Sequence, residues 1–278
     1  MRIGIGLPTS TPGGSSQVLV QWAQRAEAAG FASLGVVDRL VYDSFDPLIA
    51  LSAAAAVTTR VRLCTMIVIG PLRATAVLAK QAASLDALSN GRLVLGVSIG
   101  ARRDDYDAAG AQWAERGAQL SAQIAELRAT WDDPAIGPQT ASPAGPPVLV
   151  GGTSGASFAR AARHADGYVH GGGPPRAFAS AADKARAAWV EAERPGDPLL
   201  WGQAYFTLTD PAAGEAYMRD YYAFTGGFVE RIAAGLLTTP AAIREHIRGY
   251  ADAGCEELVM LPATSDPTEL DRLADVIA

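Results

Sequence analysis

The chain alternates between short apolar runs and longer segments whose apolar residues recur at helical spacing. The apolar runs are typical of strands buried on both faces. They predict strands at residues 3–7, 33–37, 61–68, 93–97, 148–150, 167–170, 200–208 and 257–261. Each predicted strand is followed by a predicted helix, so the strands are expected to be parallel and joined by right-handed crossovers.

The predicted helices cover residues 18–29, 47–58, 75–88, 116–131, 177–193, 240–250 and 267–277. Another helix is expected to pass through Phe158 and Ala162, and two further helical pieces lie in 212–237. Ser15 or Ser16 is expected to cap the first of them, and Thr239 the helix that begins at Pro240. Asn90-Gly91 is expected to end the third helix. Residues 101–112 and 132–147 are predicted to be loops.

Eight strand–helix units over residues 1–278 predict an α/β fold made of one (β/α)8 barrel domain, with an open doubly wound sheet as the alternative. In a barrel the loops after the strands gather at the carboxyl face, where active sites lie. Any candidate residue at the end of a predicted strand is therefore a candidate for the active site.

Composition narrows the range of partners. Hydrophobic residues make up 49% and charged residues 19% of the 278, which is typical of a globular protein. A net charge of −6 argues against a nucleic-acid partner, which needs a basic face. Cys64 and Cys255 are expected to be buried in a reducing compartment. Without a signal-peptide pattern or an apolar span, a cytoplasmic enzyme with no membrane partner is expected, and a homodimer stays open.

The segment NGRLVLGVSIGARRDD, residues 90–105, carries the most chemical information. Gly96, Ser98 and Gly100 remove side-chain bulk where the strand ends, so something is expected to approach the backbone closely there. One interpretation is the rim of a cofactor-binding barrel. The other is the GxSxG elbow of a serine hydrolase with Ser98 as nucleophile. Against the hydrolase, His164 and His246 fall on predicted helices and no apolar helix follows the serine directly.

Two glycine clusters are the best candidates for an anion site. Gly151-Gly152-Thr153 follows the fifth predicted strand and leads straight into a helix, and Gly171-Gly172-Gly173 follows the sixth. Free backbone N–H groups at a helix N-terminus bind phosphate well. Tight turns are the alternative explanation for either cluster alone.

The remaining candidate residues give weaker indications of function. Asp38 and His170 each end a predicted strand. Either could transfer a proton at the barrel mouth, or have a structural role only. Arg73 is expected to be a solvated residue at a helix start, and residues 102–105 a solvated charged loop. Three scattered histidines and no HExxH or CxxC motif predict no metal site.

Several stretches together resemble the bacterial-luciferase-like family of flavin- or deazaflavin-dependent oxidoreductases. They are AEAAGFASLGVVDRL, LIALSAAAAVTTRVRLCTMI, AKQAASLDALSNGRLVLGVSIGARRDDYDAAG, PPVLVGGTSGASFARAARHADGYVHGG and YADAGCEELVM. The resemblance implies a barrel that binds the flavin at its carboxyl mouth, and a non-prolyl cis peptide near Met66-Ile67. It implies that Asp38, Met66, Ile67 and Ser98 line the ring, and that Gly151, Gly152, Thr153, Gly171 and Gly172 hold the phosphate.

The chain also departs from branches of that family. Many deazaflavin-using relatives have a histidine after the aspartate, where this chain has Arg39. Sugar-phosphate dehydrogenase relatives have a glutamate where this chain has Ala101, which argues against glucose-6-phosphate chemistry. The expected function is therefore that of a monooxygenase-type oxidoreductase using reduced FMN on a small organic substrate. A hydride-transfer enzyme using the deazaflavin coenzyme F420 is the alternative, and the serine hydrolase is the alternative of another class.

Overall fold

The computed structural model describes all residues 1–278. Its strands are β1 (Arg2–Gly6), β2 (Ser33–Val36), β3 (Arg62–Thr65), β4 (Val68–Ile69), β5 (Leu93–Ser98), β6 (Val148–Gly151), β7 (Gly167–His170), β8 (Leu199–Phe206) and β9 (Glu257–Pro262). All of them belong to one sheet, and every pairing is parallel.

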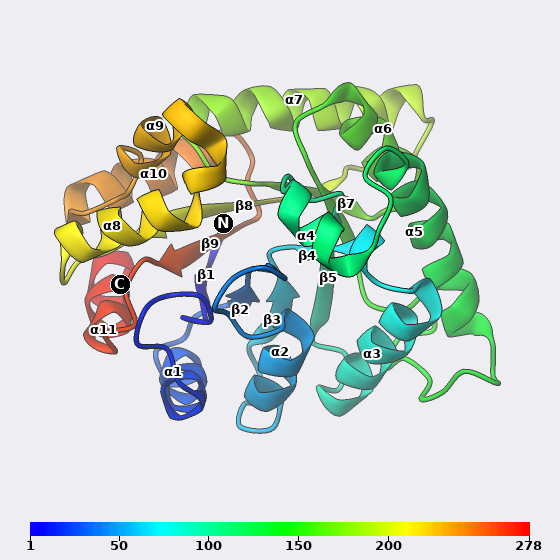
Figure 1. Cartoon of the computed structure of the whole chain (residues 1–278), viewed down its shortest axis with the longest axis horizontal. Helices are drawn as coiled ribbons and strands as arrows, with labels where there is room; N and C mark the ends of the chain where they lie inside the picture. The colour runs from blue at the N-terminus through cyan, green and yellow to red at the C-terminus, as the bar shows by residue number, and fades with distance from the viewer.

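The sheet closes on itself. The strand order runs β3-β2-β1-β9-β8-β7-β6-β5-β4, and β3 also pairs with β5. Because β3 and β4 both pair with β5, they share one position, and the barrel has eight positions. The expected (β/α)8 barrel is confirmed, and the open-sheet alternative is wrong. Figure 1 shows the helices arranged around the strands.

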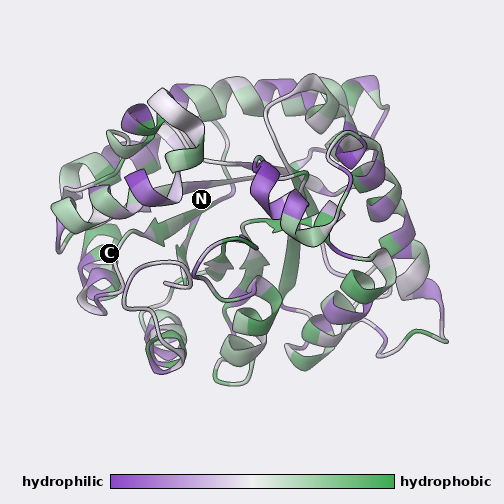
Figure 2. Ribbon diagram, in the orientation of Figure 1, coloured by the Kyte–Doolittle hydropathy of each residue, from purple (hydrophilic) through white to green (hydrophobic).

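The helices are α1 (Ser16–Ala28), α2 (Pro47–Ala55), α3 (Thr75–Leu88), α4 (Arg103–Ala109), α5 (Arg116–Asp132), α6 (Gly155–His164), α7 (Pro175–Glu191), α8 (Pro211–Tyr221), α9 (Val229–Ala233), α10 (Pro240–Asp252) and α11 (Thr268–Ile277), with 3-10 turns η1 (Gly70–Leu72) and η2 (Ala223–Phe228). Figure 2 shows mostly hydrophobic strands and helices that carry both hydrophobic and hydrophilic residues. None of the helices combines the length and the apolar character needed to cross a bilayer.

Helix-capping residues and a turn with positive φ determine where several helices begin and end. Ser15 caps α1 by accepting a hydrogen bond from the Val18 N–H, and the Thr239 hydroxyl does the same for α10. After α3, Asn90 and Gly91 both take positive φ, 56° and 80°, so the chain turns back toward β5 as expected. These caps decide where each strand–helix loop begins, and so which residues reach the barrel mouth.

The core has two parts. One lies between the sheet and the helices and contains large side chains such as Trp22, Phe178 and Tyr250. The other lies inside the barrel and includes Met66 and Trp201. Alternate residues of each strand supply the two parts, because successive side chains of a strand point to opposite faces. Cys64 and Cys255 are both buried and unpaired, as expected.

Two details differ from the sequence-based expectation. The predicted strand at 61–68 is divided into β3 and β4, and the Met66–Ile67 peptide between them is cis, as the family resemblance implied. The predicted loop at 101–112 contains α4. Asp104 and Asp105 favour its first turn through the helix dipole, and Gly110, at a φ of 63°, ends it. The loop prediction missed it because this helix is short and has no clean apolar face.

Candidate functional site

A cavity of about 180 Å3 lies at the carboxyl mouth of the barrel. Its walls come from the ends of β2, β3 and β5, from the start of α4, from β8 and from the segment after α8. The lining residues are Val37, Asp38, Arg39, Met66, Ile67, Ile69, Ser98, Gly100, Ala101, Arg102, Gln203, Tyr205, Tyr221, Tyr222 and Phe224. Part of the site predicted from the strand ends therefore lies around one cavity, while His170 and the glycine turns lie outside its lining.

All four side chains predicted to contact the flavin ring line this cavity: Asp38, Met66, Ile67 and Ser98. They come from three strand ends. Paired strands bring them together, because Val36 pairs with Thr65 and Ile69 with Ser98. The structure thus gathers these residues, while their contact with a ring stays a prediction.

The close approach expected near Gly96 comes from the chain itself. A Cβ on Gly96 would collide with the carbonyl oxygen of Thr65 and with the side chain of Ile67. Gly100 has a φ of 68°, and a Cβ there would collide with Ile69. The glycines of this segment therefore allow the β3–β4 connection to pack on β5, which shapes the cavity floor.

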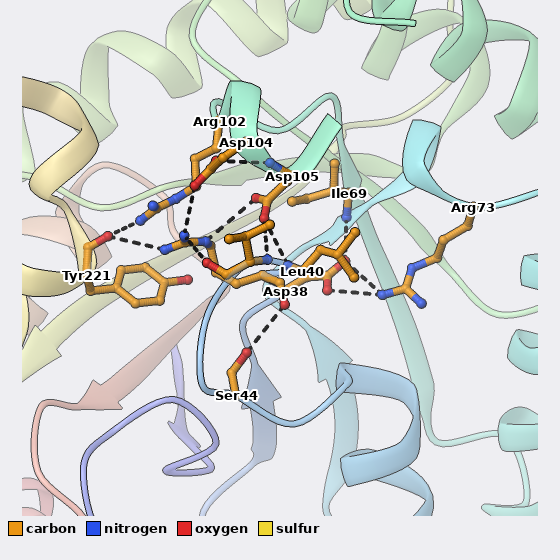
Figure 3. A network of polar contacts seen from close by, with 11 residues as sticks. Asp38, Leu40, Ser44, Ile69, Arg73, Arg102, Asp104, Asp105 and Tyr221 are labelled. Atoms are coloured by element: carbon orange, nitrogen blue, oxygen red, sulfur yellow. Dashed lines mark hydrogen bonds and ion pairs between the residues drawn. The ribbon is translucent and has the colours of Figure 1, made fainter. Parts of the chain in front are cut away.

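Asp38 is already paired within the fold. Its carboxylate accepts the Ile69 N–H at 2.9 Å, and both of its oxygens lie 3.0 Å from Arg73 (Figure 3). Arg73 also reaches Asp46 at 2.8 Å. Burial raises the pKa of Asp38, and the Arg73 guanidinium opposes that rise. The expectation that Arg73 is a solvated helix-start residue was wrong, because sequence spacing does not reveal a partner 35 residues away.

The charged run at 102–105 is only partly solvated: Arg102 and Asp105 are buried, whereas Arg103 and Asp104 are exposed. Asp105 has no exposed surface, and its carboxylate accepts the N–H groups of Leu40 and Val41 at 3.1 and 2.7 Å. Arg39 lies 3.6 Å from Asp105, and Arg102 donates to the carbonyl of Tyr221 (Figure 3). The solvated-loop prediction failed because α4 folds over the mouth and buries one side of this segment.

An aromatic wall, consisting of Tyr205, Tyr221, Tyr222 and Phe224, was missed from the sequence. The Tyr222 hydroxyl donates to the Tyr205 hydroxyl at 3.3 Å, and Arg102 stacks 3.9 Å from the Phe224 ring. Burial raises the pKa of Tyr205 and Tyr222, so both hydroxyls keep their protons at neutral pH. No motif marks these residues, because three of them lie at or just after the end of α8, whose orientation only the tertiary fold sets.

The two predicted glycine turns lie next to each other. They follow β6 and β7, which pair through Gly151 and Val169. Gly152 and Gly172 take φ values of 138° and 102°, where other residues are strained. Thr153 is exposed, and a Cβ added at Gly171 would meet nothing within 4 Å. The turns therefore leave open backbone at the rim.

The glycine turns and the cavity share residues at their boundary. Ile67, which lines the cavity, packs so closely on Gly151 that a Cβ there would collide with it. Gln203, also in the lining, donates from Nε2 to the Gly171 carbonyl at 3.1 Å. The cavity lining and the glycine turns are therefore in direct contact.

His170 ends β7 beside the second turn and is only 5% exposed. Its Nδ1 lies 3.2 Å from the Tyr168 hydroxyl, and its Nε2 has no hydrogen-bond partner. Burial lowers the pKa of His170, although a backbone contact with Gly172 partly offsets this. It does not line the mouth cavity, so its role in proton transfer stays a prediction.

The serine-hydrolase alternative is not supported by the geometry. The Ser98 Oγ accepts the Gly100 N–H at 3.2 Å and has no contact with a histidine. His170 is engaged by Tyr168, and His246 stacks on Tyr250 in α10 with ring centroids 4.6 Å apart. A nucleophilic serine needs an adjacent base, which Ser98 lacks.

A second cavity of about 340 Å3 lies where the β1–α1 and β2–α2 loops meet the end of α8. Tyr42 closes one side by donating to Asp220 at 2.6 Å, and its ring meets Tyr221 of the first cavity edge to face. Hydroxyls and the carboxylates of Asp43 and Asp220 line it, with no basic side chain. An anionic group would be repelled there, so the phosphate-binding candidate remains the pair of glycine turns.

Solved structures with the same fold include oxidoreductases of both cofactor types. Monooxygenase RslO1 from Streptomyces bottropensis matches with a TM-score of 0.79 and 22% identity, over 100% of this chain and 97% of that one. An F420-dependent secondary alcohol dehydrogenase, solved with an F420-acetone adduct, has a TM-score of 0.80 and 16% identity over 99% and 97%. The FMN complex of a Baeyer-Villiger monooxygenase from Pseudomonas putida has a TM-score of 0.75 and 17% identity over 100% and 96%. At these identities the likeness establishes the fold alone.

Sequence relatives share parts of the chain. An uncharacterized protein of Mycobacterium tuberculosis is 35% identical over 188 residues, 55% of this chain and 65% of that protein, somewhat under two thirds of its length. The F420-dependent glucose-6-phosphate dehydrogenase of Amycolatopsis mediterranei is 32% identical over 123 residues, 41% of this chain and 37% of that enzyme.

The family model of the luciferase-like monooxygenases matches residues 1–259, nearly the entire chain. This match agrees with the closed barrel, with the cavity at its carboxyl mouth and with the solved structures that share the fold. The chain belongs to the luciferase-like monooxygenase family.

Proposed function

We propose that this protein is an oxidoreductase whose redox chemistry resides in a flavin or deazaflavin cofactor. The cofactor ring would occupy the mouth cavity, and its phosphate would lie on the glycine turns after β6 and β7. One observation carries the proposal: residues of the cavity lining, Ile67 and Gln203, directly contact Gly151 and Gly171 of those turns. The proposed binding sites for the cofactor ring and for its phosphate are therefore adjacent.

The phosphate end fits the residues present. The turn at Gly151-Gly152-Thr153 leads into α6, whose N-cap is Ser154, and the second turn precedes α7. Free N–H groups and the helix dipole favour an anion at the start of α6. Pro174 and Pro175 at the start of α7 have no N–H, so the second turn can offer only its glycine amides. The open space beside Gly171 leaves room for phosphate oxygens, since a Cβ there would meet no atom within 4 Å.

The ring end also fits. The cavity is lined by apolar side chains such as Met66 and Ile67 and by the aromatic wall, and such surfaces suit a flat aromatic ligand. Gly100 and Ala101 leave the rim of β5 free of bulky side chains. The ring would then be shielded from water on the side that Tyr222 and Phe224 cover.

A bound reduced flavin or deazaflavin supplies a hydride, and reduced FMN can also react with oxygen. The protein's own contribution is to bind, orient and exclude water. The Tyr205 hydroxyl, which accepts from Tyr222, would offer a hydrogen-bond donor inside the cavity. Asp38, held by Arg73, would keep the β2 rim in place, and a proton-transfer role for Asp38 or His170 is retained as a proposal.

The cofactor class is tested by binding. We expect either FMN or coenzyme F420 to raise the thermal unfolding temperature of the protein, because a ligand that binds only the native state stabilises it. Absorbance of the bound ring, measured after gel filtration, gives an independent readout. Stabilisation by FMN supports the monooxygenase type, and stabilisation by F420 alone supports hydride transfer to or from a small organic substrate. If neither cofactor binds, the proposed function is wrong.

The phosphate position is tested by the substitution Gly171→Ala. Its added methyl group meets no atom of the fold, so we expect unchanged stability but at least about tenfold weaker binding of the phosphorylated cofactor, a loss of about 1.4 kcal/mol. Riboflavin, which has the same ring and no phosphate, is the matched ligand control and should bind wild type and variant alike. Equal loss for both ligands would place the phosphate elsewhere.

A further inference from the structure

His170 lies between the two glycine turns. It ends β7, immediately before Gly171, and its Nε2 is 3.9 Å from where a Cβ of Gly173 would be. Through the Tyr168 hydroxyl it is also linked to the first turn, because that hydroxyl donates to the Gly152 carbonyl at 2.8 Å. One imidazole therefore connects the backbone of both turns.

The hydrogen bonds determine where the proton of neutral His170 lies. A carbonyl cannot donate, so the single hydroxyl proton of Tyr168 goes to Gly152. The Tyr168 oxygen must then accept from Nδ1 of His170, which lies 3.2 Å away. In the neutral ring this leaves Nε2 without a proton and with no hydrogen-bond partner, and the nearby Gly172 backbone favours only the protonated ring.

An unpartnered acceptor is the wrong group for an anion site in its neutral form. Once protonated, the same Nε2 becomes a charged N–H donor, and hydrogen bonds between charged partners are the stronger ones. We propose that His170 is a proton-linked anion-binding residue, which takes up a proton when a phosphate group binds to the adjacent glycine turns. This inference rests on the proposed function for the position of the phosphate, and it adds a coupling between pH and binding.

The surroundings of His170 offer no other group that titrates near neutral pH. Tyr168 on β7 and Tyr250 on α10 face it or its turn, and burial raises the pKa of both hydroxyls. His246 stacks on the far side of Tyr250, and burial lowers its pKa to about 4. Phe178 of α7 and Gly202 of β8 carry no charge, and Arg176 in the first turn of α7 is an exposed cation. A proton taken up when an anion binds to these turns would therefore belong to His170.

The test uses inorganic sulfate and FMN with the full-length protein. Sulfate is a dianion that does not titrate near neutral pH, so any proton uptake on its binding comes from the protein. The chain has only three histidines, and their imidazole NMR signals can be assigned with the variants His164→Gln, His170→Gln and His246→Gln. We expect saturating sulfate to raise the pKa of His170 by at least about one unit and to leave the other two unchanged.

Binding measured by calorimetry gives the second readout. A shift of one unit corresponds to at most about tenfold tighter sulfate binding in the wild type, measured from pH 8 down to a pH below the pKa of His170 in the free protein. His170→Gln keeps a hydrogen-bonding amide that does not titrate, so its sulfate affinity should no longer depend on pH, whereas His164→Gln and His246→Gln should retain the wild-type dependence.

The outcomes separate the two proposals. If sulfate or FMN binds and the pKa of His170 does not move, the proton-linked role is wrong and the cofactor proposal stands. If neither ligand binds at any pH, the phosphate position itself is wrong, and the role of His170 fails with it. The wild-type NMR titration decides the matter even if His170→Gln does not fold.

Discussion

The carboxylate of Asp38, at the barrel mouth, is held by hydrogen bonds and an ion pair within the protein. It accepts the Ile69 N–H and pairs with Arg73, which in turn reaches Asp46 at the start of α2. Breaking a largely buried pair costs more than breaking a surface pair, because the remaining charge stays partly desolvated. Asp38, which follows β2, therefore ties that strand end to the end of β4 beside the cavity.

The substitution Arg73→Ala should lower the free energy of unfolding by about 2 kcal/mol, since charge-assisted hydrogen bonds to Asp38 and Asp46 are lost. Urea denaturation measures the change. The matched control is Arg103→Ala, which removes an exposed i,i+4 pair with Asp107 and should cost less than about 0.5 kcal/mol. Similar losses for the two variants would mean that the Arg73 pair is as weak as a surface pair.

Among the elements, α4 has the most influence on the mouth. In Figure 1 it lies across the strands near β4 and β5, apart from the surrounding helices. Its Asp105 accepts two N–H groups of the β2–α2 loop, while Arg102 at its N-cap donates to the end of α8. This short helix thereby joins three loops that line the cavity.

Asp105→Ala should therefore destabilise the protein by about 3 kcal/mol, because Arg39 loses a buried partner and two N–H groups lose their acceptor. It should also speed proteolytic cleavage within residues 40–46, which limited proteolysis can measure. The neighbouring substitution Asp104→Ala is the control: that side chain is half exposed and lies 3.7 Å from Arg39, so its loss should cost less than about 1 kcal/mol. A larger effect at Asp104 than at Asp105 would contradict this account.

At the scale of the whole molecule, closure of the sheet depends on the β3–β5 pairing and on contacts that hold neighbouring units together. Glu27 of α1 is one of these contacts. Its carboxylate accepts the N–H groups of Thr59, Arg60 and Val61 at the start of β3. Burial alone would raise the pKa of Glu27, but these hydrogen bonds outweigh it and lower the pKa to about 2.

A folded-state pKa below the ordinary value of 4.5 means that Glu27 stabilises the fold above that pH, and that this contribution is lost as pH falls from about 4.5 to 2. Glu27→Gln should cost about 1 kcal/mol at pH 7, a figure reduced for its solvent exposure, and almost nothing near pH 2. Denaturation curves measured across this range test the prediction. Glu126→Gln, an exposed position on α5, should show no such trend, and a constant Glu27→Gln effect at all pH values would refute the mechanism.

Much of the fold could be predicted from the sequence because its signals are local. The strand runs, Ser15, Thr239 and the Asn90-Gly91 turn each act within a few residues, and the eight-unit alternation follows from them. The residues expected around a flavin ring lie at strand ends, so the barrel brings them together at one rim.

What the sequence could not reveal depends on contacts between distant segments. Local sequence patterns predict solvated side chains at Arg73 and Asp105, because their partners lie 35 and about 65 residues away. The aromatic wall at Tyr221, Tyr222 and Phe224 depends on the direction in which α8 ends, and no local pattern encodes that direction.

The sequence by itself determined the periodicity, the eight strand–helix units and the positions of the glycine turns, because each follows from local backbone preferences and from burial of alternate side chains. Only the tertiary structure decided which charges are paired, which aromatic residues cover the mouth and that His170 lies with an unpartnered nitrogen between the two turns. Those features arise when barrel closure brings remote residues within hydrogen-bond distance, and long-range pairing of that kind leaves no local signal in the chain.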